Sequence, residues 1–539
     1  MSSASGAASA QDDRVVTPAE ERRVIIASSV GTVFEWYDFY LYATLAPFFA
    51  ALFFPKGNET AALLSAFATY AAGFLVRPFG AIVFGRIGDL VGRKYTFLVT
   101  IVVMGSATAL VGFLPTYETM GMVAPILLVS LRLAQGLALG GEYGGAATYV
   151  AEHAPDGKRG SATSWIQTTA TVGFFLALVI IGICRWSMDP KVFTSWGWRV
   201  PFILSIILLG ISVYIRLKLQ ESPVFLRMKR RGKTSLSPLV DSFFKYPNNK
   251  YVALALFGAT AGQGVVWYTG QFYALFFLTL YLKVDYLTAY TLIGASLVIG
   301  TPFFIVFGKL SDRIGRLKII LAGCLLAALT YFPLFRGLTQ SINPALKTFQ
   351  ETVPISVSAS DCSFHIFVLP GTTFTPCDKA KDLLTKNGLN FRSLPAIGGA
   401  DVVTRIGDIE IRGFDEAKLN EALKVSGYPA TWTRSEANFP LAILVLVIMV
   451  LYVTMVYGPI AAYLVELFPT NIRYTSMSLP YHIGNGWFGG MLPLLATAMV
   501  AASGDIYYGL WYPIVVSVVT VIVGALFLHE TKDVKFHED

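Results

Sequence analysis

The sequence predicts an all-α membrane protein: twelve transmembrane helices in two six-helix bundles, with a small α/β insert outside the membrane. Hydrophobic residues make up 54% of the 539 residues and charged residues only 14%, whereas soluble domains carry about 25% charged residues. Apolar blocks of about 20 residues, the length that crosses a bilayer, recur along most of the chain. A short charged loop also occurs twice, at matching positions of the two halves.

The apolar blocks predict the order of the elements. The expected helices lie at residues 24–54, 61–85, 95–115, 123–150, 162–185, 199–219, 251–282, 287–308, 318–336, 438–465, 475–502 and 509–529. Residues 1–23 lack the apolar core of a signal peptide and are expected to form a disordered cytosolic tail. The remaining parts are a first bundle at 24–219, a cytosolic central loop at 220–250, a second bundle at 251–336 and 438–529, an insert at 337–437 and a cytosolic tail at 530–539.

Lysine and arginine residues predict the orientation. The tails and loops on the side of the N-terminus hold most of the 42 such residues, whereas the short loops of the opposite side hold only Lys56, Arg185, Lys191, Arg199 and Lys283. Because short loops rich in Lys and Arg stay in the cytosol, we expect both termini to be cytosolic. The net charge of +8 then reflects topology and not nucleic-acid binding.

A loop of the form G-x-x-x-D-x-x-G-R follows the second helix of each half. It runs from Gly85 to Arg93 in the first half and from Gly308 to Arg316 in the second. Glycines allow a tight turn and a close approach of helices, and an acid near a helix end can accept hydrogen bonds from free backbone N–H groups. The two loops indicate that the halves of the chain repeat one another.

This repeated loop resembles the signature loop of the major facilitator superfamily. The resemblance implies the major facilitator fold, two six-helix bundles around a cavity that opens alternately to either side, and a protein that works as a monomer. It also implies that Asp89, Arg93, Asp312 and Arg316 govern conformational gating. The alternative is that these four residues only anchor the topology and cap helices.

Other segments narrow the resemblance to the metabolite:proton symporter branch, whose members include permeases for α-ketoglutarate, citrate, shikimate, and proline or betaine. These segments are Gly31–Tyr40, Leu75–Gly80, Arg132–Gly145, Ala151–Pro155, Glu221–Phe225 and Glu466–Tyr474. The resemblance covers all twelve helices but not the insert. It is specific for the branch and not for the substrate.

Charged residues inside the predicted spans are costly unless they are paired or hydrated, so they mark candidate functional positions. Glu35 and Asp38, three residues apart, fall on one face of the first helix. We expect these carboxyl groups, Asp38 above all, and Glu142 on the fourth helix to couple transport to protons. The alternative is a structural role in which the acids pair with a neighbouring basic group.

Arg77 and Arg132 lie well inside predicted spans, away from the ends. A guanidinium group matches a carboxylate bidentately, so both are expected to bind a substrate that carries a carboxylate. Arg132 can instead couple to an acid that titrates. A purely structural role is the alternative for either residue.

The seventh and eleventh helices carry polar and aromatic candidates. Gln263, Trp267 and Gln271 follow one another at intervals of four residues, with Tyr268 beside them, which favours a wall where a solute is stacked and hydrogen-bonded. Ordinary helix packing is an equal alternative, and the bound solute is expected to contact Gln271, Trp267 and Tyr268. His482 suits proton transfer, although a hydrogen-bonded structural histidine is favoured there.

The insert is expected to be an extracytosolic α/β module. Its predicted elements are strands at Ile355–Ser358, Phe364–Val368 and Ile406–Ile411 and helices at Asp378–Lys386 and Asp415–Val425. In an oxidising periplasm its two cysteines, Cys362 and Cys377, favour a disulfide. No metal site is expected, because these cysteines and His365 lack zinc-site spacing. The module is either a solute-capturing lid, a docking domain for a periplasmic partner, or without a role.

These expectations combine into a secondary active transporter of a bacterial cytoplasmic membrane. It would import a small organic acid or zwitterionic metabolite with protons, and its partners would be that solute, protons and the lipid bilayer. The sequence shows no nucleotide-binding loop, metal constellation or nucleophile motif, so neither an enzyme nor a cofactor is expected. The alternatives are an exporter or uniporter of the same fold, or a solute sensor that uses the external module.

Overall fold

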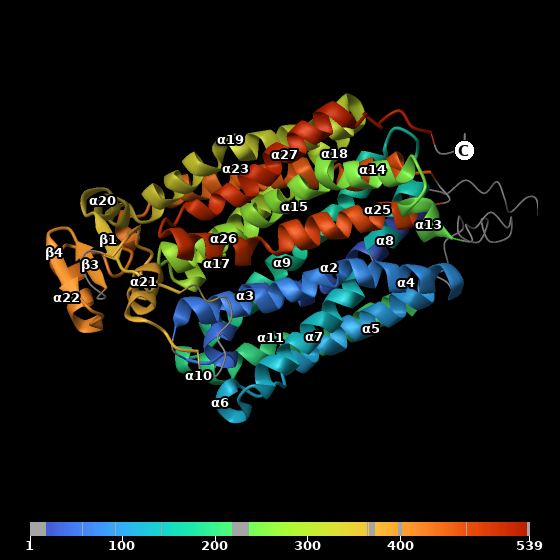
Figure 1. Cartoon of the computed structure of the whole chain (residues 1–539). Helices are drawn as coiled ribbons and strands as arrows, with labels where there is room; N and C mark the ends of the chain where they lie inside the picture. The colour runs from blue at the N-terminus through green and yellow to red at the C-terminus, as the bar shows by residue number, and fades with distance from the viewer. Residues whose placement is uncertain are drawn as a thin grey trace, which may run out of the picture.

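The computed structural model describes residues 18–56, 58–91, 93–141, 143–217, 237–363, 365, 372–396, 402–469 and 472–535. Within these ranges the side chains of 18–28, 85–91, 93–97, 145, 149, 152–153 and 215–216 are not described. Figure 1 shows two helical bundles side by side, with the insert at one end. We call that end the insert end, and the opposite end, where α27 finishes, the tail end.

The first bundle contains six helical spans. Its helices are α2 (Pro18–Phe53), α3 (Glu59–Leu75), α4 (Arg77–Val91), α5 (Arg93–Val111), α7 (Val123–Gly140), α8 (Tyr143–His153), α9 (Arg159–Ser187) and α11 (Val200–Leu217), with α6 (Tyr117–Met120), α10 (Pro190–Ser195) and η1 (Gly197–Arg199) in the loops. The second span consists of α3 and α4, which meet at Val76 just before Pro78. A proline lacks the backbone N–H that the helix ladder needs, which favours a break there.

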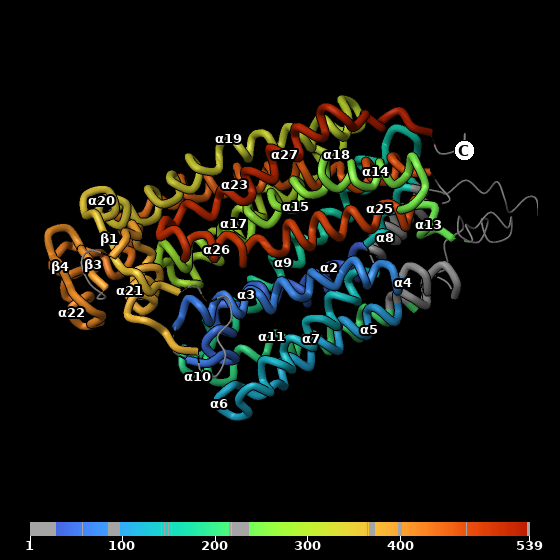
Figure 2. Tube along the Cα trace, in the orientation of Figure 1, coloured from blue at the N-terminus to red at the C-terminus, as the bar shows by residue number. Residues whose placement is uncertain are grey.

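The second bundle repeats this plan with more irregular helices. The seventh span consists of α14 (Asn248–Ala255), η2 (Leu256–Thr260), α15 (Ala261–Tyr268), η3 (Thr269–Tyr273), α16 (Ala274–Phe276) and η4 (Phe277–Tyr281), preceded by α13 (Pro238–Phe243). The others are α17 (Tyr286–Gly300) with α18 (Pro302–Ile314), α19 (Arg316–Ile342), α23 (Phe439–Tyr457) with α24 (Ile460–Leu467), α25 (Arg473–His482) with η6 (Ile483–Gly490) and α26 (Leu492–Ser503), and η7 (Tyr508–Leu510) with α27 (Trp511–Phe527). Figure 2 follows this path from blue to red.

The predicted membrane fold is confirmed. Among the described residues, ten helices are long and apolar enough to cross a membrane, and α2 and α5 bring the helical spans of this part of the chain to twelve. Four predicted boundaries were wrong, each by six residues. The second helix ends at Val91 and not at 85, and the eighth at Ile314 and not at 308, so most of each repeated loop is helical. The first helix begins at Pro18 and not at residue 24, because a proline and two acids suit a helix N-terminus. The ninth runs to Ile342 and not to 336, and ends at Asn343, which caps the next helix.

The described part of the insert contains a four-stranded sheet and three α-helices. The sheet order is β2 (Arg392–Leu394), β1 (Ile355–Ser358), β3 (Val403–Ile406) and β4 (Ile409–Arg412). β1 pairs in parallel with β2 and antiparallel with β3, which pairs antiparallel with β4. The helices are α20 (Pro344–Thr352), α21 (Pro376–Lys386) and α22 (Glu416–Val425), and the short η5 (Arg434–Glu436) leads back to α23.

Most predicted elements of the insert are confirmed. The strand at Ile355–Ser358 is present as predicted, and the two predicted helices correspond to α21 and α22. The predicted strand Ile406–Ile411 was wrong, because a hairpin turn divides it at Gly407, whose φ of 56° suits glycine. The predicted strand Phe364–Val368 falls outside the described residues except at His365.

Candidate functional site

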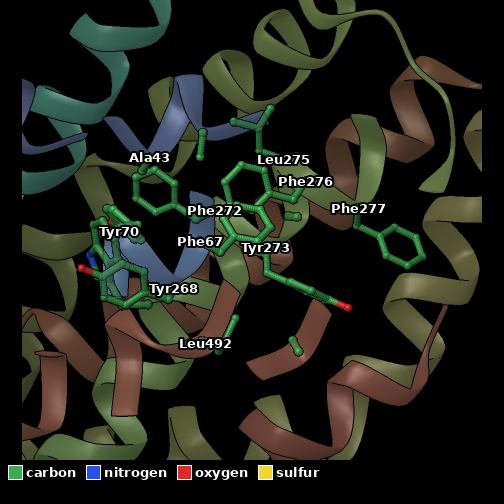
Figure 3. Close-up of a cluster of buried hydrophobic side chains, with 14 of the residues drawn as sticks. Ala43, Phe67, Tyr70, Tyr268, Phe272, Tyr273, Leu275, Phe276, Phe277 and Leu492 are labelled. Atoms are coloured by element: carbon green, nitrogen blue, oxygen red, sulfur yellow. The ribbon is translucent and has the colours of Figure 1, made fainter. Parts of the chain in front are cut away.

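Aromatic side chains from both bundles meet in the middle of the molecule, a contact we call the aromatic seam (Tyr40, Phe174, Trp267 and Phe272). The ring of Trp267 stacks on Tyr40 of the first bundle at 5.4 Å between centroids, with 24° between the planes. Phe272 lies 5.0 Å from Tyr40 and 4.2 Å from Phe174. All four are buried, and Figure 3 shows Phe272 among neighbouring buried side chains, which include Phe67 and Phe276.

Irregular turns of the seventh span decide which of its residues reach the seam. The π-helical segments η2, η3 and η4 add residues to individual turns and shift the register of the residues that follow. Gln263 therefore points into its own bundle, where its amide exchanges two hydrogen bonds with that of Asn485, at 2.9 and 2.8 Å. Gln271 instead donates across the seam to Thr171 Oγ1 of α9, at 3.5 Å. The predicted single stripe is thus divided between two environments.

Arg77 is a fully buried cation beside the seam, at the start of α4. Its guanidinium carbon lies 5.2 Å from the ring centroid of Phe74 and 5.9 Å from those of Trp36 and Phe39. None of its three guanidinium nitrogens has a hydrogen-bond partner among the described residues. Gly140 allows α7 to approach, because a Cβ there would overlap the carbonyl oxygen of Arg77.

The second bundle faces Arg77 with α25. Tyr481 and His482 belong to α25, which packs against α4, and Tyr457 is the last residue of α23. The two tyrosine hydroxyls are 2.7 Å apart, while both ring nitrogens of His482 are buried without a partner in the described structure. The hydrogen-bonded histidine favoured from the sequence is therefore not observed.

Arg132 lies inside the first bundle. Its guanidinium donates to Gln135 Oε1 at 2.5 Å and packs against the rings of Phe39, Tyr42 and Tyr70, at 4.5, 4.6 and 5.2 Å. Cation–π contacts of this kind stabilise a desolvated cation. Arg132 thus contacts residues of its own bundle, and a role for it in substrate binding stays a prediction.

Asp38 is also buried in the first bundle, with 4% of its surface exposed. Ser205 of α11 donates a hydrogen bond of 2.6 Å to Asp38 Oδ1. Glu35, one turn earlier on α2, is equally buried. The two acids are therefore held in the core of the bundle, where a change of protonation would alter a desolvated charge.

A charged network joins the bundles at the tail end. Asp312 of α18 accepts hydrogen bonds from the backbone N–H groups of Gly160 and Ser161, both at 2.9 Å, at the N-terminus of α9. Arg316 pairs with Asp312 at 2.7 Å and with Glu466 at 3.0 Å. A carboxylate at a helix N-terminus is favoured by the free N–H groups and by the helix dipole.

Glu466 extends this network across the bundles. Both its carboxylate oxygens accept from Arg316, at 3.0 and 3.2 Å, and Thr531 donates to it at 2.9 Å. Arg159 of the first bundle lies 3.7 Å away. Asp89 and Arg93, the matching residues of the first repeated loop, and Glu142 have side chains outside the described residues.

Contacts also join the bundles at the insert end. The guanidinium of Arg185 lies over the rings of Phe48 of the first bundle, at 4.2 Å, and Tyr286 of the second, at 4.3 Å. Phe67 and Phe276 meet across the bundles at 4.8 Å, as Figure 3 shows. The described structure is therefore held together at the tail end, along the seam and at the insert end.

In the insert, Cys362 and Cys377 form a disulfide, with their Cα atoms 5.1 Å apart. Cys377 belongs to the first turn of α21, so the bridge fixes the start of that helix. Within the described part of the chain, no group of three His, Cys, Asp or Glu residues is arranged to hold a metal ion.

Sequence reasoning missed several residues of these contacts. Ser205 and Asn485 carried no signal, because a polar residue in an apolar span has many roles. Glu466 had a signal, since it opens the quoted segment Glu466–Tyr474. Arg159 had one as the charged first residue of the fifth span, α9. Charged residues at the tail ends of several spans could have been proposed to meet there.

Comparisons with known proteins agree with this architecture. The family described as Major Facilitator Superfamily matches residues 28–349, and that described as Sugar (and other) transporter matches residues 423–538. The chain is 38% identical to the inner membrane metabolite transport protein YhjE of Escherichia coli (strain K12) over 61% of this chain and 76% of that protein.

Two further relatives are named as transporters of particular solutes. The putative proline/betaine transporter of Staphylococcus haemolyticus (strain JCSC1435) is 30% identical over 94% of this chain and 87% of that protein. The shikimate transporter of Escherichia coli (strain K12) is 35% identical over 61% and 76%. Among solved structures, a D-xylose–proton symporter superposes with a TM-score of 0.61 at 15% identity, covering 95% of this chain and 98% of that chain, which supports the fold alone.

Proposed function

Because the chain belongs to the major facilitator superfamily, we propose that it imports a small organic acid or zwitterionic metabolite together with protons. It is a multi-pass membrane transporter and not an enzyme. The proposal concerns the cargo, the coupling ion and the direction, and it is supported by charged and aromatic groups that meet between and within the bundles.

The buried guanidinium of Arg77 is the observation that carries the choice of cargo. A buried cation without a counter-charge or hydrogen-bond acceptor is costly, and none of the described residues supplies either. A carboxylate on the solute would satisfy two of its N–H groups at once. Shikimate, proline and betaine, for which relatives are named, each carry a carboxylate.

The aromatic seam also supports the proposed cargo. Trp267 and Tyr40 stack across the bundles, with Tyr268 beside Phe74 at 5.5 Å, so a solute bound near Arg77 would displace ring–ring contacts and stack in their place. Aromatic faces bind quaternary ammonium groups as well as planar rings. Gln271 would then donate to the solute instead of Thr171.

Asp38 is the proposed proton carrier. It is the buried acid whose contact with Ser205 links α2 to α11, so protonation there would change how two helices of the first bundle pack. Glu35 and Glu142 are proposed to act with it. Arg132, enclosed by aromatic rings of α2 and α3, is proposed to relay this change towards Arg77 and the seam.

Alternating access would then require the contacts at each end to break in turn. Asp312 and Arg316 would release α9 to open the tail end, and Asp89 and Arg93 are proposed to act likewise in the first half. We place the tail end and both chain termini in the cytosol of a bacterium, because the predicted loops there are rich in Lys and Arg. The insert end would face the periplasm.

Uptake by proteoliposomes tests the proposal. The solutes are α-ketoglutarate, citrate, shikimate, proline and betaine, offered with and without an inward proton gradient. We expect one of them to accumulate, to stop accumulating with an uncoupler, and in Asp38→Asn to equilibrate without accumulating. A solute that the wild-type protein carries only to equilibrium would make it a uniporter, and one that it carries only outward would make it an exporter.

Arg77 variants test the cargo site separately. We expect Arg77→Gln to raise the KM for the carboxylate solute by roughly tenfold to a hundredfold, because a charged hydrogen-bond pair is lost. Arg77→Lys keeps the charge but not the bidentate geometry, so its KM should lie between those of the wild type and Arg77→Gln. Arg412→Gln, at an exposed arginine of the insert, is the matched control. Unchanged KM in Arg77→Gln would contradict the carboxylate site.

A further inference from the structure

The insert reaches across to the first bundle through one helix, α21. Asp382 of α21 accepts hydrogen bonds from two backbone N–H groups at the start of α3: that of Thr60 at 2.8 Å and that of Glu59 at 3.3 Å. Four residues further along α21, Lys386 pairs with the Glu59 side chain at 2.5 Å. Figure 1 shows α21 between the sheet of the insert and the end of α3.

These bonds complete the N-terminus of α3. The first N–H groups of a helix have no partner within it. Asn58 caps α3 by accepting from Ala61 N at 2.8 Å, and the N–H groups of Glu59 and Thr60 are left for Asp382. An acid of the insert therefore supplies what the first bundle lacks at this point.

The same arrangement occurs at the opposite end of the molecule. There Asp312, from the second half of the chain, accepts from two successive N–H groups at the N-terminus of α9. In both places one carboxylate spans two backbone donors of the first bundle, and in both it benefits from the helix dipole. The insert end thus has a counterpart of the gating contact at the tail end.

The rest of the insert is attached to the second bundle. Phe391 N donates to Gly504 O at 2.8 Å, and Ile506 N donates to Asn390 Oδ1 at 2.9 Å, which ties the segment after α21 to the loop between α26 and η7. Lys283, after the seventh span, donates to the carbonyl oxygen of Lys386. The insert should therefore move with the second bundle, so the contact between α21 and α3 must break when the bundles part.

The start of α21 is held rigidly. Thr375 and Asp378 form a reciprocal capping box, Ser363 N donates to Asp378 Oδ1 at 2.6 Å, and the disulfide reaches Cys377. A rigid support fixes the position of Asp382 better than a free loop would.

We propose that α21 is an outer latch, in which Asp382 holds α3 to the second bundle and stabilises the form that is closed at the insert end. Asp382 is a positioning residue that touches no cargo, and Lys386 adds an exposed ion pair. The proposal uses only the motion of the two bundles, so it stands or fails independently of the cargo and of proton coupling.

Cysteine accessibility in lipid nanodiscs tests the latch. Cys184 and Cys324 are replaced by serine, and one reporter is introduced per protein: Ala43→Cys near the insert end or Ala147→Cys near the tail end, both fully buried. In Asp382→Ala we expect a bulky maleimide to label the Ala43 reporter roughly five- to thirtyfold faster, as the loss of two charge-assisted hydrogen bonds implies. The Ala147 reporter should not react faster.

Asp408→Ala is the matched control, because Asp408 is an exposed acid in the β3–β4 turn of the same insert. In this variant the Ala43→Cys reporter should be labelled at the wild-type rate. Asp382→Asn keeps one acceptor oxygen and causes less disturbance, so it should accelerate labelling to a smaller extent. It replaces Asp382→Ala in the test if the alanine variant is not monodisperse. The latch is refuted if the Ala43 reporter reacts at the control rate in both variants, or if both reporters accelerate equally.

Discussion

Replacing Glu466 by glutamine should weaken the contact between the two bundles at the tail end. The effect should exceed that of replacing any other single charged residue there by an uncharged one. The Glu466 carboxylate is fully buried between Arg316 of its own bundle and Arg159 of the other. Glutamine keeps the size and one acceptor oxygen but removes the charge. Two buried guanidinium groups then share one site, paired with Asp312 and Asp156 in the described structure.

The structure sets the scale of the effect. Removing one partner from a buried ion pair costs about 3–5 kcal/mol, and about 1.4 kcal/mol corresponds to a factor of ten. The pair with Arg316 lies within the second bundle, so its loss should lower the stability of every conformation. The contact with Arg159 crosses the bundles, and its loss, together with repulsion between Arg159 and Arg316, should favour opening at the tail end.

Two measurements follow from this division. Thermal unfolding in detergent should show a clear fall in Tm for Glu466→Gln, and the Ala147→Cys reporter should be labelled faster while the Ala43→Cys reporter is not. Glu421→Gln, at an exposed acid of α22, is the control. If Glu466→Gln melts and labels like Glu421→Gln, the network does not hold the tail end and the reasoning fails.

Three further predictions concern separate contacts. Cys377→Ser should destabilise the insert by about 3 kcal/mol, because the bridge closes a loop of 15 residues; limited proteolysis of the full chain should cut the variant faster, and equal rates would contradict this. Burial lowers the pKa of Lys283 to about 8, so its protonated form disfavours the folded state. The stability of wild type relative to Lys283→Met should therefore rise between pH 7 and pH 9. A constant difference in Tm would exclude that account. Gln263→Leu leaves Asn485 Oδ1 without its donor, while Asn485 Nδ2 keeps its bond to Tyr481 O. This should cost about 1–3 kcal/mol, part of which the double variant with Asn485→Leu should restore. Equal Tm values for the single and double variants would show that the pairing is unimportant.

The helices were predictable because their signals are local. A run of apolar residues as long as a bilayer is thick determines a span whatever its neighbours are, and ten spans meet that criterion in the described residues. The capping residues of the insert helices are equally local, as Thr375 and Asp415 show. The hairpin at Gly407 could also have been predicted, because Gly407–Asp408 is a two-residue turn signal between two alternating runs.

The partners of the charged residues were not predictable. Asp312 was expected to accept hydrogen bonds near a helix end, yet its donors at Gly160 and Ser161 are some 150 positions away. Asp382 lies in a segment without any family pattern, and its donors belong to the second span. Such contacts depend on how two bundles meet, and no pattern within one helix records that.

The sequence by itself thus determined the spans, the repeat of the two halves and the residue types placed in the membrane, because burial in lipid limits the choice at every position. Only the tertiary structure decided that Arg132 is enclosed within its bundle, while Arg77 stands beside the seam with no hydrogen-bond partner in the described part of the chain. It also decided that Gln263 and Gln271 face different environments. The physical reason is that π-helical turns and contacts between bundles set the direction of a side chain, and both arise from packing over the whole molecule.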